Sequence, residues 1–340
     1  MRQNLIIFVV GLLLVSLVTT SSYSEENRKL AQTSFQFLSV VSDARGVAMA
    51  EAMTSLQTGS SALFFNPAGM ASINGMIDIT ASNNQWIADI THNTFSMAVS
   101  PFNGQYGVLG VSVQTVDYGE FYGTRVDKSS DLGYQDTEVF ELAAASVGIG
   151  YAKQLTDRFA VGGQIRRVVQ DLGESEIPLS YNQEDSTYLT GMVNNKLSPF
   201  AFDFGTQFHT GYKSLVFGMS VRNFCKEIKY VDEGFQLPLV FNLGISMNLM
   251  DFMAAAPLDQ SLMLSIDASH FRSHPEQVKI GLDYQVMRLL SLRSGYISNN
   301  DESGLSYGFG VNHFGIAFDY SYTPFGIFDN VQRMTIRFQL

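Results

Sequence analysis

The stretch DARGVAMAEAMTSLQTGSSALFFNPAGMA, residues 43–71, separates two kinds of sequence in this chain. Its first half is rich in small residues and carries apolar positions on or near one face at helical spacing, namely Ala44, Val47, Ala48, Ala50, Met53 and Leu56. In its second half, Pro67 fixes its own φ and pushes Asn66 out of the α region, and Gly69 supplies a permissive backbone. The stretch therefore predicts a compact N-terminal plug with a helical first half and a turn near its end.

After Ala71 the sequence consists of short segments in which apolar and polar residues alternate. In residues 200–208, phenylalanine occupies positions 200, 202, 204 and 208, while small or polar residues occupy the odd positions. About fourteen such segments of roughly eight to twelve residues follow one another, the length that a tilted strand needs to cross a bilayer. The second part of the chain is therefore predicted to be all-β, with one face of every strand apolar.

Composition narrows the class of protein further. The chain has 340 residues, of which 46% are hydrophobic and only 16% are charged, below the roughly 25% charged residues of average soluble domains. The net charge of −11 excludes nucleic acid as an expected partner. Cys225 is the one cysteine, so the sequence offers neither a disulfide framework nor a zinc-binding cluster.

The N-terminus has the pattern of an export signal. Arg2 precedes an apolar run from Leu5 to Val18, and Ser22-Tyr23-Ser24 supplies small residues for cleavage after Ser24. An N-terminal membrane anchor is the alternative, although a run of about fourteen residues is shorter than the roughly twenty that a spanning helix needs. The predicted organisation is a signal peptide over 1–24, a flexible periplasmic lead-in and plug over 25–74, and a β domain over 75–340.

The connections predict how the β domain is oriented. Short turns are expected at 101–105, 154–158, 210–214, 287–289 and 312–314, and long, polar, acidic links at 117–136, 171–197 and 222–237. Alternate short and long connections are typical of barrels with short periplasmic turns and long outer loops. The chain also ends on Phe338-Gln339-Leu340, an aromatic, apolar ending similar to the signal that barrel assembly machinery reads.

An exported, apolar, strand-rich chain is either a secreted β-sandwich or a transmembrane β-barrel. The strand length and the alternation favour an antiparallel barrel of about 14 strands in the bacterial outer membrane, in contact with lipid and lipopolysaccharide. A lumen of that width is too large for side chains to fill. The plug of residues 43–71 is therefore expected to lie inside the lumen. Paired glycines such as Gly148 and Gly150 lack the further features of a dinucleotide loop, so we expect them to relieve curvature and to make room near the plug.

The segments Asp43-Ala44-Arg45-Gly46 and Phe64-Phe65-Asn66-Pro67-Ala68-Gly69-Met70-Ala71 resemble the N-terminal signature of FadL-like outer-membrane barrels, most closely the PorV/PorQ branch. Ala50 departs from this pattern, because the branch usually has glycine there. The resemblance implies a fourteen-stranded barrel with an N-terminal hatch. It also implies two alternative functions. The PorV branch carries secreted proteins by their C-terminal domains in type IX secretion, whereas FadL passes long-chain fatty acids and other hydrophobic molecules.

The candidate ligand or plug residues are Asp43, Arg45, Gly46, Met49, Glu51, Phe64, Phe65, Asn66, Pro67, Ala68, Gly69 and Met70. We hypothesise that Arg45 and Glu51 pair with lumen charges, of which the candidates are Asp203, Asp267, Asp283, Lys279 and Arg337. Solvation of Arg45 in a wet lumen is the alternative. The sequence indicates no catalytic residues, because no histidine lies near a nucleophile motif. It also indicates no metal ligands and no cofactor.

Between the two functions, the lengths of 117–136 and 171–197 slightly favour a carrier or docking role in surface-protein secretion over the passage of hydrophobic small molecules. A lateral opening between strands and an apolar pocket beside the hatch would favour the second, whereas long, ordered outer loops that form a protein-sized groove would favour the first.

Overall fold

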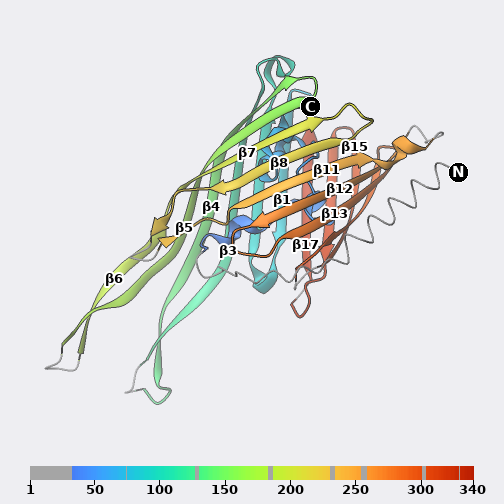
Figure 1. The fold of residues 1–340 in the computed structure, drawn as a ribbon. Coiled ribbons are helices and arrows are strands. Elements are labelled where there is room, and N and C mark those ends of the chain that lie inside the picture. The colour runs from blue at the N-terminus through green and yellow to red at the C-terminus, as the bar shows by residue number, and fades with distance from the viewer. Residues whose placement is uncertain are drawn as a thin grey trace.

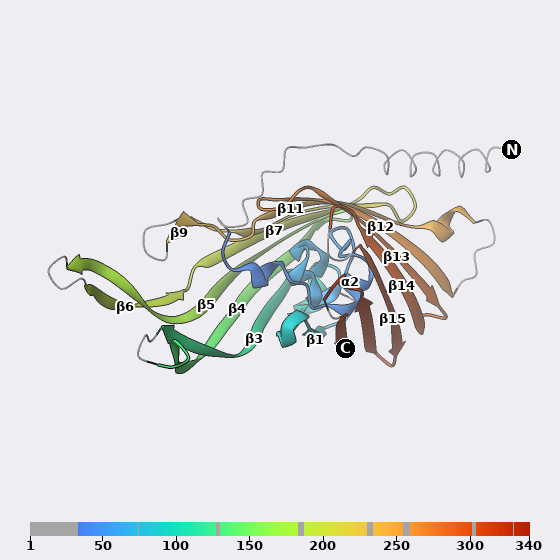
Figure 2. The same ribbon diagram turned by 90° about the horizontal axis from the view of Figure 1, so that it is seen from below.

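The computed structural model describes residues 33–73, 75–126, 130–182, 187–229, 234–253, 259–300, 304–328 and 330–340. The predicted leader and residues 25–32 lie outside the described residues. The rest forms a β-barrel with the segment 33–73 enclosed within it (Figures 1 and 2). In the described part of the chain, no helix is long and apolar enough to cross a membrane.

Fourteen strands of the described residues form the barrel. They are β1 (Ile77–Gln85), β2 (Thr91–Val99), β3 (Val108–Val126), β4 (Tyr134–Thr156), β5 (Phe159–Asn182), β7 (Phe200–His209), β8 (Val216–Phe224), β11 (Val240–Asn248), β12 (Gln260–Phe271), β13 (Gln277–Val286), β14 (Leu290–Ile297), β15 (Leu305–His313), β16 (Ile316–Thr323) and β17 (Val331–Gln339). All neighbours are antiparallel, β4 pairs with β5, and β1 pairs with β17, so the sheet is closed. The predicted barrel of about fourteen strands is confirmed.

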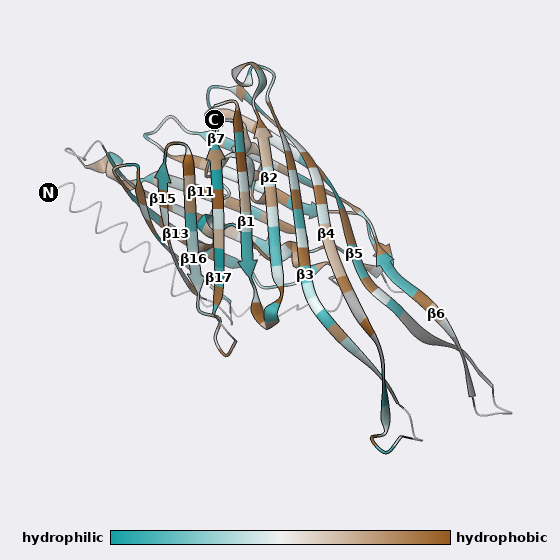
Figure 3. Cartoon of the chain, turned by 180° about the vertical axis from the view of Figure 1, so that it is seen from behind, coloured by the Kyte–Doolittle hydropathy of each residue, from teal (hydrophilic) through white to brown (hydrophobic). Residues whose placement is uncertain are grey.

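The two faces of the wall have opposite chemistry. On β7, Asp203 and Gln207 are fully buried toward the lumen, whereas Phe204 is 55% exposed on the outer face. Figure 3 shows the same alternation of hydrophilic and hydrophobic bands along the other strands. An apolar exterior around a polar interior is the arrangement of a transmembrane barrel, in which lipid covers the outer face.

The connections sort to two ends of the barrel. We call the end with the short turns the base, and the opposite end the mouth. The turns at 157–158, 287–289 and 314–315 lie at the base with the helical turns η6 (Pro101–Gly104) and η7 (Leu249–Phe252). The mouth carries η5 (Ile87–Asp89) and the small sheet of β9 (Ile228–Lys229) and β10 (Gly234–Phe235).

Two predicted loops are strands instead. β3 and β4 continue to pair with each other beyond Asp117, and β5 continues beyond Asp171 by pairing with β6 (Thr187–Leu197). These two hairpin arms project from the mouth (Figure 1). The segments 117–136 and 171–197, expected as long polar links, are thus largely strands, because they keep strand-compatible residues such as Phe121 and Tyr122.

The enclosed segment contains four short helical turns. They are η2 (Gln36–Ser39), α2 (Ala44–Ala48), η3 (Gly59–Phe64) and η4 (Pro67–Met70). The helix predicted for the first half is shorter than expected, because Ala50 and Glu51 adopt left-handed backbone angles, with φ of 54° and 62°. Residues 33–42, for which we expected a flexible lead-in, are packed at the mouth, where Thr33 forms a bridge to Gln236.

Candidate functional site in the plugged lumen

Residues 43–73, called the hatch below, contact the barrel wall through a belt of glycines. A Cβ added to any belt glycine would come within 3 Å of a hatch atom. The belt consists of Gly110, Gly150, Gly162, Gly205, Gly218, Gly244, Gly281, Gly295 and Gly308, one from each of nine strands. The expectation that strand glycines make room for the plug is confirmed at Gly150, which lies against Leu63, whereas Gly148 lies against wall side chains, those of Gln164, Arg166 and Ser112.

Asn66 anchors the second half of the hatch. Its backbone is extended, with φ of −141°, as expected for a residue before proline. Its side-chain amide donates to the carbonyl oxygens of Thr54, at 2.7 Å, and Thr206, at 3.0 Å, and its Oδ1 accepts from the N–H of Ala68 at 3.1 Å. Asn66 thus ties two parts of the hatch to β7.

The neighbours of Asn66 fit closely against the same side of the wall. Pro67 and Ala68 lie on Gly162 of β5. Gly69 leaves space for the Leu56 carbonyl, which accepts from Nε2 of Gln207 at 2.9 Å. Met70 is fully buried against Gly110.

An apolar cluster fills the centre of the hatch. Met49, Met53, Leu56 and Phe65 form it, with Phe64 packed against it. Gly46 lies directly under the Phe65 ring, where a side chain would collide. These predicted residues therefore hold the hatch together.

Charged pairs connect the hatch to the opposite wall. Nη2 of Arg45 lies 3.4 Å from Oδ2 of Asp283, and Oε2 of Glu51 lies 2.6 Å from Nζ of Lys279. The hypothesis that Arg45 and Glu51 pair with lumen charges is confirmed. Asp203 does not take part, because it binds Arg166 of the adjacent strand at 2.7 Å.

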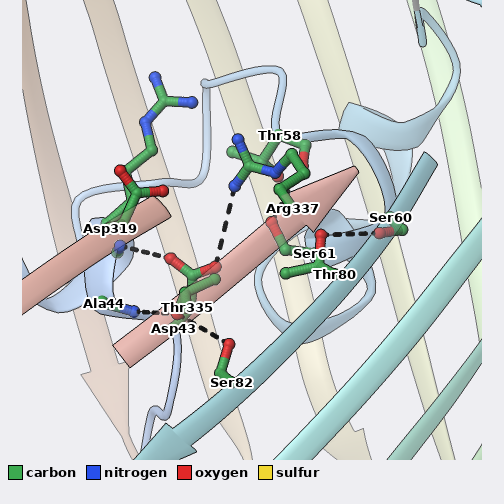
Figure 4. A network of polar contacts seen from close by, with 12 residues as sticks. Asp43, Ala44, Thr58, Ser60, Ser61, Thr80, Ser82, Asp319, Thr335 and Arg337 are labelled. Carbon is green, nitrogen blue, oxygen red and sulfur yellow. Dashed lines mark hydrogen bonds and ion pairs between the residues drawn. The ribbon is translucent and has the colours of Figure 1, made fainter. Parts of the chain in front are cut away.

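Polar contacts also dock the hatch on the seam between β1 and β17 (Figure 4). The N–H of Ala44 donates to Oγ1 of Thr335, which in turn donates to Oγ of Ser82, both at 2.8 Å. Oγ of Ser60 donates to Oγ1 of Thr80 at 3.0 Å. At the start of α2, Oδ1 of Asp43 caps the helix by accepting from Gly46 N–H.

All twelve predicted site residues therefore lie inside the barrel, but they do not converge on one pocket. Glu51 and Phe65 line a small cavity of about 30 Å³ toward the mouth, together with Leu38, Val41, Thr54, Arg222, Asn223, Pro238, Val240, Asn242, Phe271, Lys279 and Ser39. Arg45 lines a second, polar cavity of about 160 Å³ toward the base.

Sequence reasoning missed an apolar cluster at the mouth, called the chamber below, which the chain's own side chains fill. The inward residues Val116, Ala144, Val168 and Ala201 form one tier on β3, β4, β5 and β7, and Phe35, Phe37, Leu38 and Leu237 fill the space inside it. The next inward tier toward the base is polar, with Gln114, Ser146, Arg166 and Asp203. The Phe-Gln-Phe-Leu sequence at 35–38, within an otherwise polar lead-in, was the available signal.

Comparisons with known proteins identify the class of fold. No family model and no curated protein matches the chain. The Ralstonia pickettii toluene transporter TbuX is 11% identical, with a TM-score of 0.57 over 87% of this chain and 98% of that one. The CymD monoaromatic hydrocarbon channel is 12% identical, with a TM-score of 0.58 over 88% and 97%.

A FadL homologue of Pseudomonas aeruginosa is also 12% identical, with a TM-score of 0.54 over 88% of this chain and 98% of that chain. These likenesses show that the chain has the fold of the FadL-like outer-membrane barrels. At this level of identity they establish the fold alone, and the resemblance to the PorV/PorQ branch stays a prediction.

Proposed function

We propose that the protein lies in the bacterial outer membrane and passes hydrophobic small molecules through its lumen past the hatch. The observation that carries this proposal is the apolar chamber at the mouth. Most of the inward wall is built from serine, threonine, asparagine, aspartate and arginine, as in a water-filled barrel. A second apolar patch of the wall, formed by Ala98, Val108 and Ala152, packs against Leu63 and Met70 of the hatch. The tier of valine and alanine at the mouth instead packs against residues 35–38, which precede the hatch, and an apolar surface at that end suits an apolar ligand.

The chamber accommodates aromatic groups, because the chain's own side chains occupy it. Phe35 is 1% exposed and Phe37 is 4% exposed within the chamber. An apolar ligand entering from the mouth would replace these side chains against Val116 and Val168 at little cost in buried apolar area. Segment 33–38 is thus expected to move aside when the chamber is loaded.

The small cavity below the chamber suits the next step of such a path. Leu38, Val41 and Phe65 line this cavity together with Arg222, Lys279 and Glu51. Glu51 pairs with Lys279, so Arg222 is the cation that the cavity offers to a ligand. Among the described residues, Nε of Arg222 is buried without a hydrogen-bond partner. A carboxylate on an otherwise apolar molecule, such as a long-chain fatty acid, would pair with this cation.

Retention of ligand by the purified protein tests the proposal. The full chain in detergent is incubated with toluene or a long-chain fatty acid, desalted, and analysed by mass spectrometry. Val168→Asp places a charge in the apolar tier and is expected to reduce retention at least tenfold, whereas Val168→Ala keeps the tier apolar and is expected to retain ligand. Equal retention by the two variants, or no retention by the unmodified chain, would contradict passage of hydrophobic molecules.

A carrier or docking role in surface-protein secretion is the second candidate, and the two hairpin arms favour it. In the described residues, β3 beyond Asp117 pairs with β4 alone and β5 beyond Asp171 pairs with β6 alone, so the other edge of each strand has no barrel partner there. Such edges can add a strand from a partner protein. Co-purification of secreted C-terminal domains with the full chain, lost when 118–142 is replaced by a short turn, would support this role. Recovery of lipid-like molecules alone would exclude it.

A further inference from the structure

A second cavity lies on the other side of the hatch, near the base. It has a volume of about 160 Å³, enough for about five waters at roughly 30 Å³ each. Its lining is almost entirely polar and comes from α2 and from β13 to β17. It contains the guanidinium groups of Arg45, Arg293 and Arg337 and the carboxylates of Asp283 and Asp319.

The two carboxylates of this cavity are already shared. Arg293 forms an ion pair with each of them, with Nε 3.1 Å from Oδ2 of Asp283 and Nη1 2.6 Å from Oδ1 of Asp319. Asp283 also forms an ion pair with Arg45, whose Nη2 lies 3.4 Å from Oδ2 of Asp283. Among the described residues, the remaining cation of the cavity, Arg337, forms its ion pair with Asp43, and the 3.9 Å between Nη2 and Oδ2 exceeds hydrogen-bond distance (Figure 4).

Asp43 is a poor counter-ion for Arg337. Its Oδ1 accepts a hydrogen bond from Gly46 N–H at 2.6 Å as the cap of α2. Burial raises the pKa of the Asp43 carboxyl, and the Arg337 guanidinium only partly offsets this. Within the described residues, the buried guanidinium nitrogens without a hydrogen-bond partner at this site are Nε of Arg45, Nε of Arg293, and Nε and Nη2 of Arg337. Two carboxylate oxygens, Oδ2 of Asp43 and Oδ1 of Asp283, are also buried without a partner, so the donors outnumber the acceptors. Unpaired buried donors on charged groups are costly, which indicates that something else accepts from them.

We propose that this cavity is a binding site for a small oxyanion, of the phosphate or carboxylate class, held between Arg45 of the hatch and Arg337 of β17. Guanidinium groups bind oxyanions through paired N–H donors, and three of the four unpartnered guanidinium nitrogens that line the cavity belong to Arg45 and Arg337, the two arginines that lack a full counter-charge. Ser291 and Asn312 add neutral polar groups to the lining. The cavity has room for a free ion or for one terminal phosphate or carboxylate group of a larger molecule. The carboxylates of Asp283 and Asp319 repel an anion, so we expect it to bind beside Arg45 and Arg337.

The site joins the hatch to the wall through the ligand. Arg45 belongs to α2 and Arg337 to the last strand, so an anion between them adds a contact that neither residue makes to the other. Binding is thus expected to stabilise the seated position of the hatch. This proposal does not depend on what passes through the lumen.

Binding of inorganic phosphate to the full chain in detergent tests the site. Isothermal titration at constant ionic strength in a chloride background is expected to show one saturable site per chain. Arg337→Gln and Arg45→Gln are each expected to weaken binding at least tenfold. Arg288→Gln, which removes an exposed arginine from the β13–β14 turn at the same end of the barrel, is the matched control and is expected to bind normally.

The source of the anion is distinguished by a second titrant. Glycerol phosphate mimics a lipid headgroup, acetate a free carboxylate, and their affinities relative to inorganic phosphate identify the preferred group. Heat-dependent migration on a gel confirms that each variant is a folded barrel, and Arg337→Lys provides a charge-conserving variant should Arg337→Gln fail to fold. Absence of saturable binding by the unmodified chain at millimolar phosphate, or binding that survives both glutamine substitutions, overturns the proposal.

Discussion

Lys279 of β13 places Nζ 2.6 Å from Oε2 of Glu51, so the wall of the barrel holds the turn that ends the hatch helix. Glu51 has a left-handed backbone, with φ of 62°, and its N–H donates to the carbonyl of Gly46 at 2.8 Å. A non-glycine residue in this conformation costs roughly 1 kcal/mol or more and persists when its surroundings hold it. The ion pair is part of those surroundings, because it fixes the side chain of the strained residue.

Removing one member of this pair is expected to loosen the hatch. Glu51→Gln leaves the Lys279 ammonium, whose side chain is 6% exposed, without a carboxylate. We expect a loss of about 1–3 kcal/mol in the free energy of hatch opening, measured by hydrogen exchange of the amides in 44–58. The swapped pair, Glu51→Lys with Lys279→Glu, should recover most of it. Unchanged exchange in the single variant would show that the pair contributes nothing.

Substitution of two adjacent glycines of β5 distinguishes the effect of a clash with the hatch from the effect of alanine on the strand itself. A Cβ on Gly162 would lie 2.5 Å from the backbone of Pro67 and Ala68, whereas a Cβ on Gly163 meets nothing closer than 3.5 Å. Gly162→Ala is therefore expected to destabilise the seated hatch by about 1–3 kcal/mol, and Gly163→Ala to stay within about 0.5 kcal/mol. Denaturant unfolding of both variants measures the difference. Equal effects would mean that the hatch is not seated against Gly162.

Asn66 offers a test of the hatch anchor. Asn66→Ala removes three hydrogen bonds and leaves the buried carbonyls of Thr54 and Thr206 without this donor, at a cost of about 1–3 kcal/mol. Asn66→Asp keeps the size and the bond from Ala68 but turns an oxygen toward both carbonyls. We expect Asn66→Asp to be at least as destabilising as Asn66→Ala in thermal unfolding. A neutral effect of Asn66→Asp would argue that the amide does not donate to these carbonyls.

The assignment of the outer face to lipid has its own test at the middle of β7. Phe204→Arg places a cation on the outer face and is expected to cost about 2–4 kcal/mol in folding into phospholipid vesicles. Phe204→Leu, which keeps the position apolar, is expected to cost less than about 1.5 kcal/mol. Folding is measured by urea titration in vesicles. If arginine is tolerated as well as leucine, this face does not contact hydrocarbon.

The wall was predictable from the sequence, because a period of two residues is a local property that lipid on one side enforces at every strand. The same logic placed Lys279 and Asp283 in the lumen, where the charges of Glu51 and Arg45 meet them. The early end of α2 was not predictable. Ala50 takes its left-handed angle where Gly295 of the distant wall leaves room for its backbone, and alanine itself favours a helix.

The chamber at the mouth could not be derived from periodicity either. Val116 and Val168 continue the inward register of their strands, and alternation alone does not say that these two positions meet Phe35. Their meeting depends on the course of residues 33–42, which carry no regular pattern. The two hairpin arms were not predicted either. Their acidic residues are typical of solvated loops, whereas Phe121 and Tyr122 have high strand propensity.

The seam between β1 and β17 joins the start of the barrel to its very end, with the N–H groups of Met76 and Ile77 both donating to the carbonyl of Leu340. The cylinder therefore cannot shut before Leu340 has been synthesised. The hatch leaves the ribosome before every strand of the barrel, yet its contacts with Gly281, Gly295 and Gly308 belong to strands that are made more than 200 residues later. Long-range contacts of this kind form slowly, so a segment made before the barrel is among the last to settle into place.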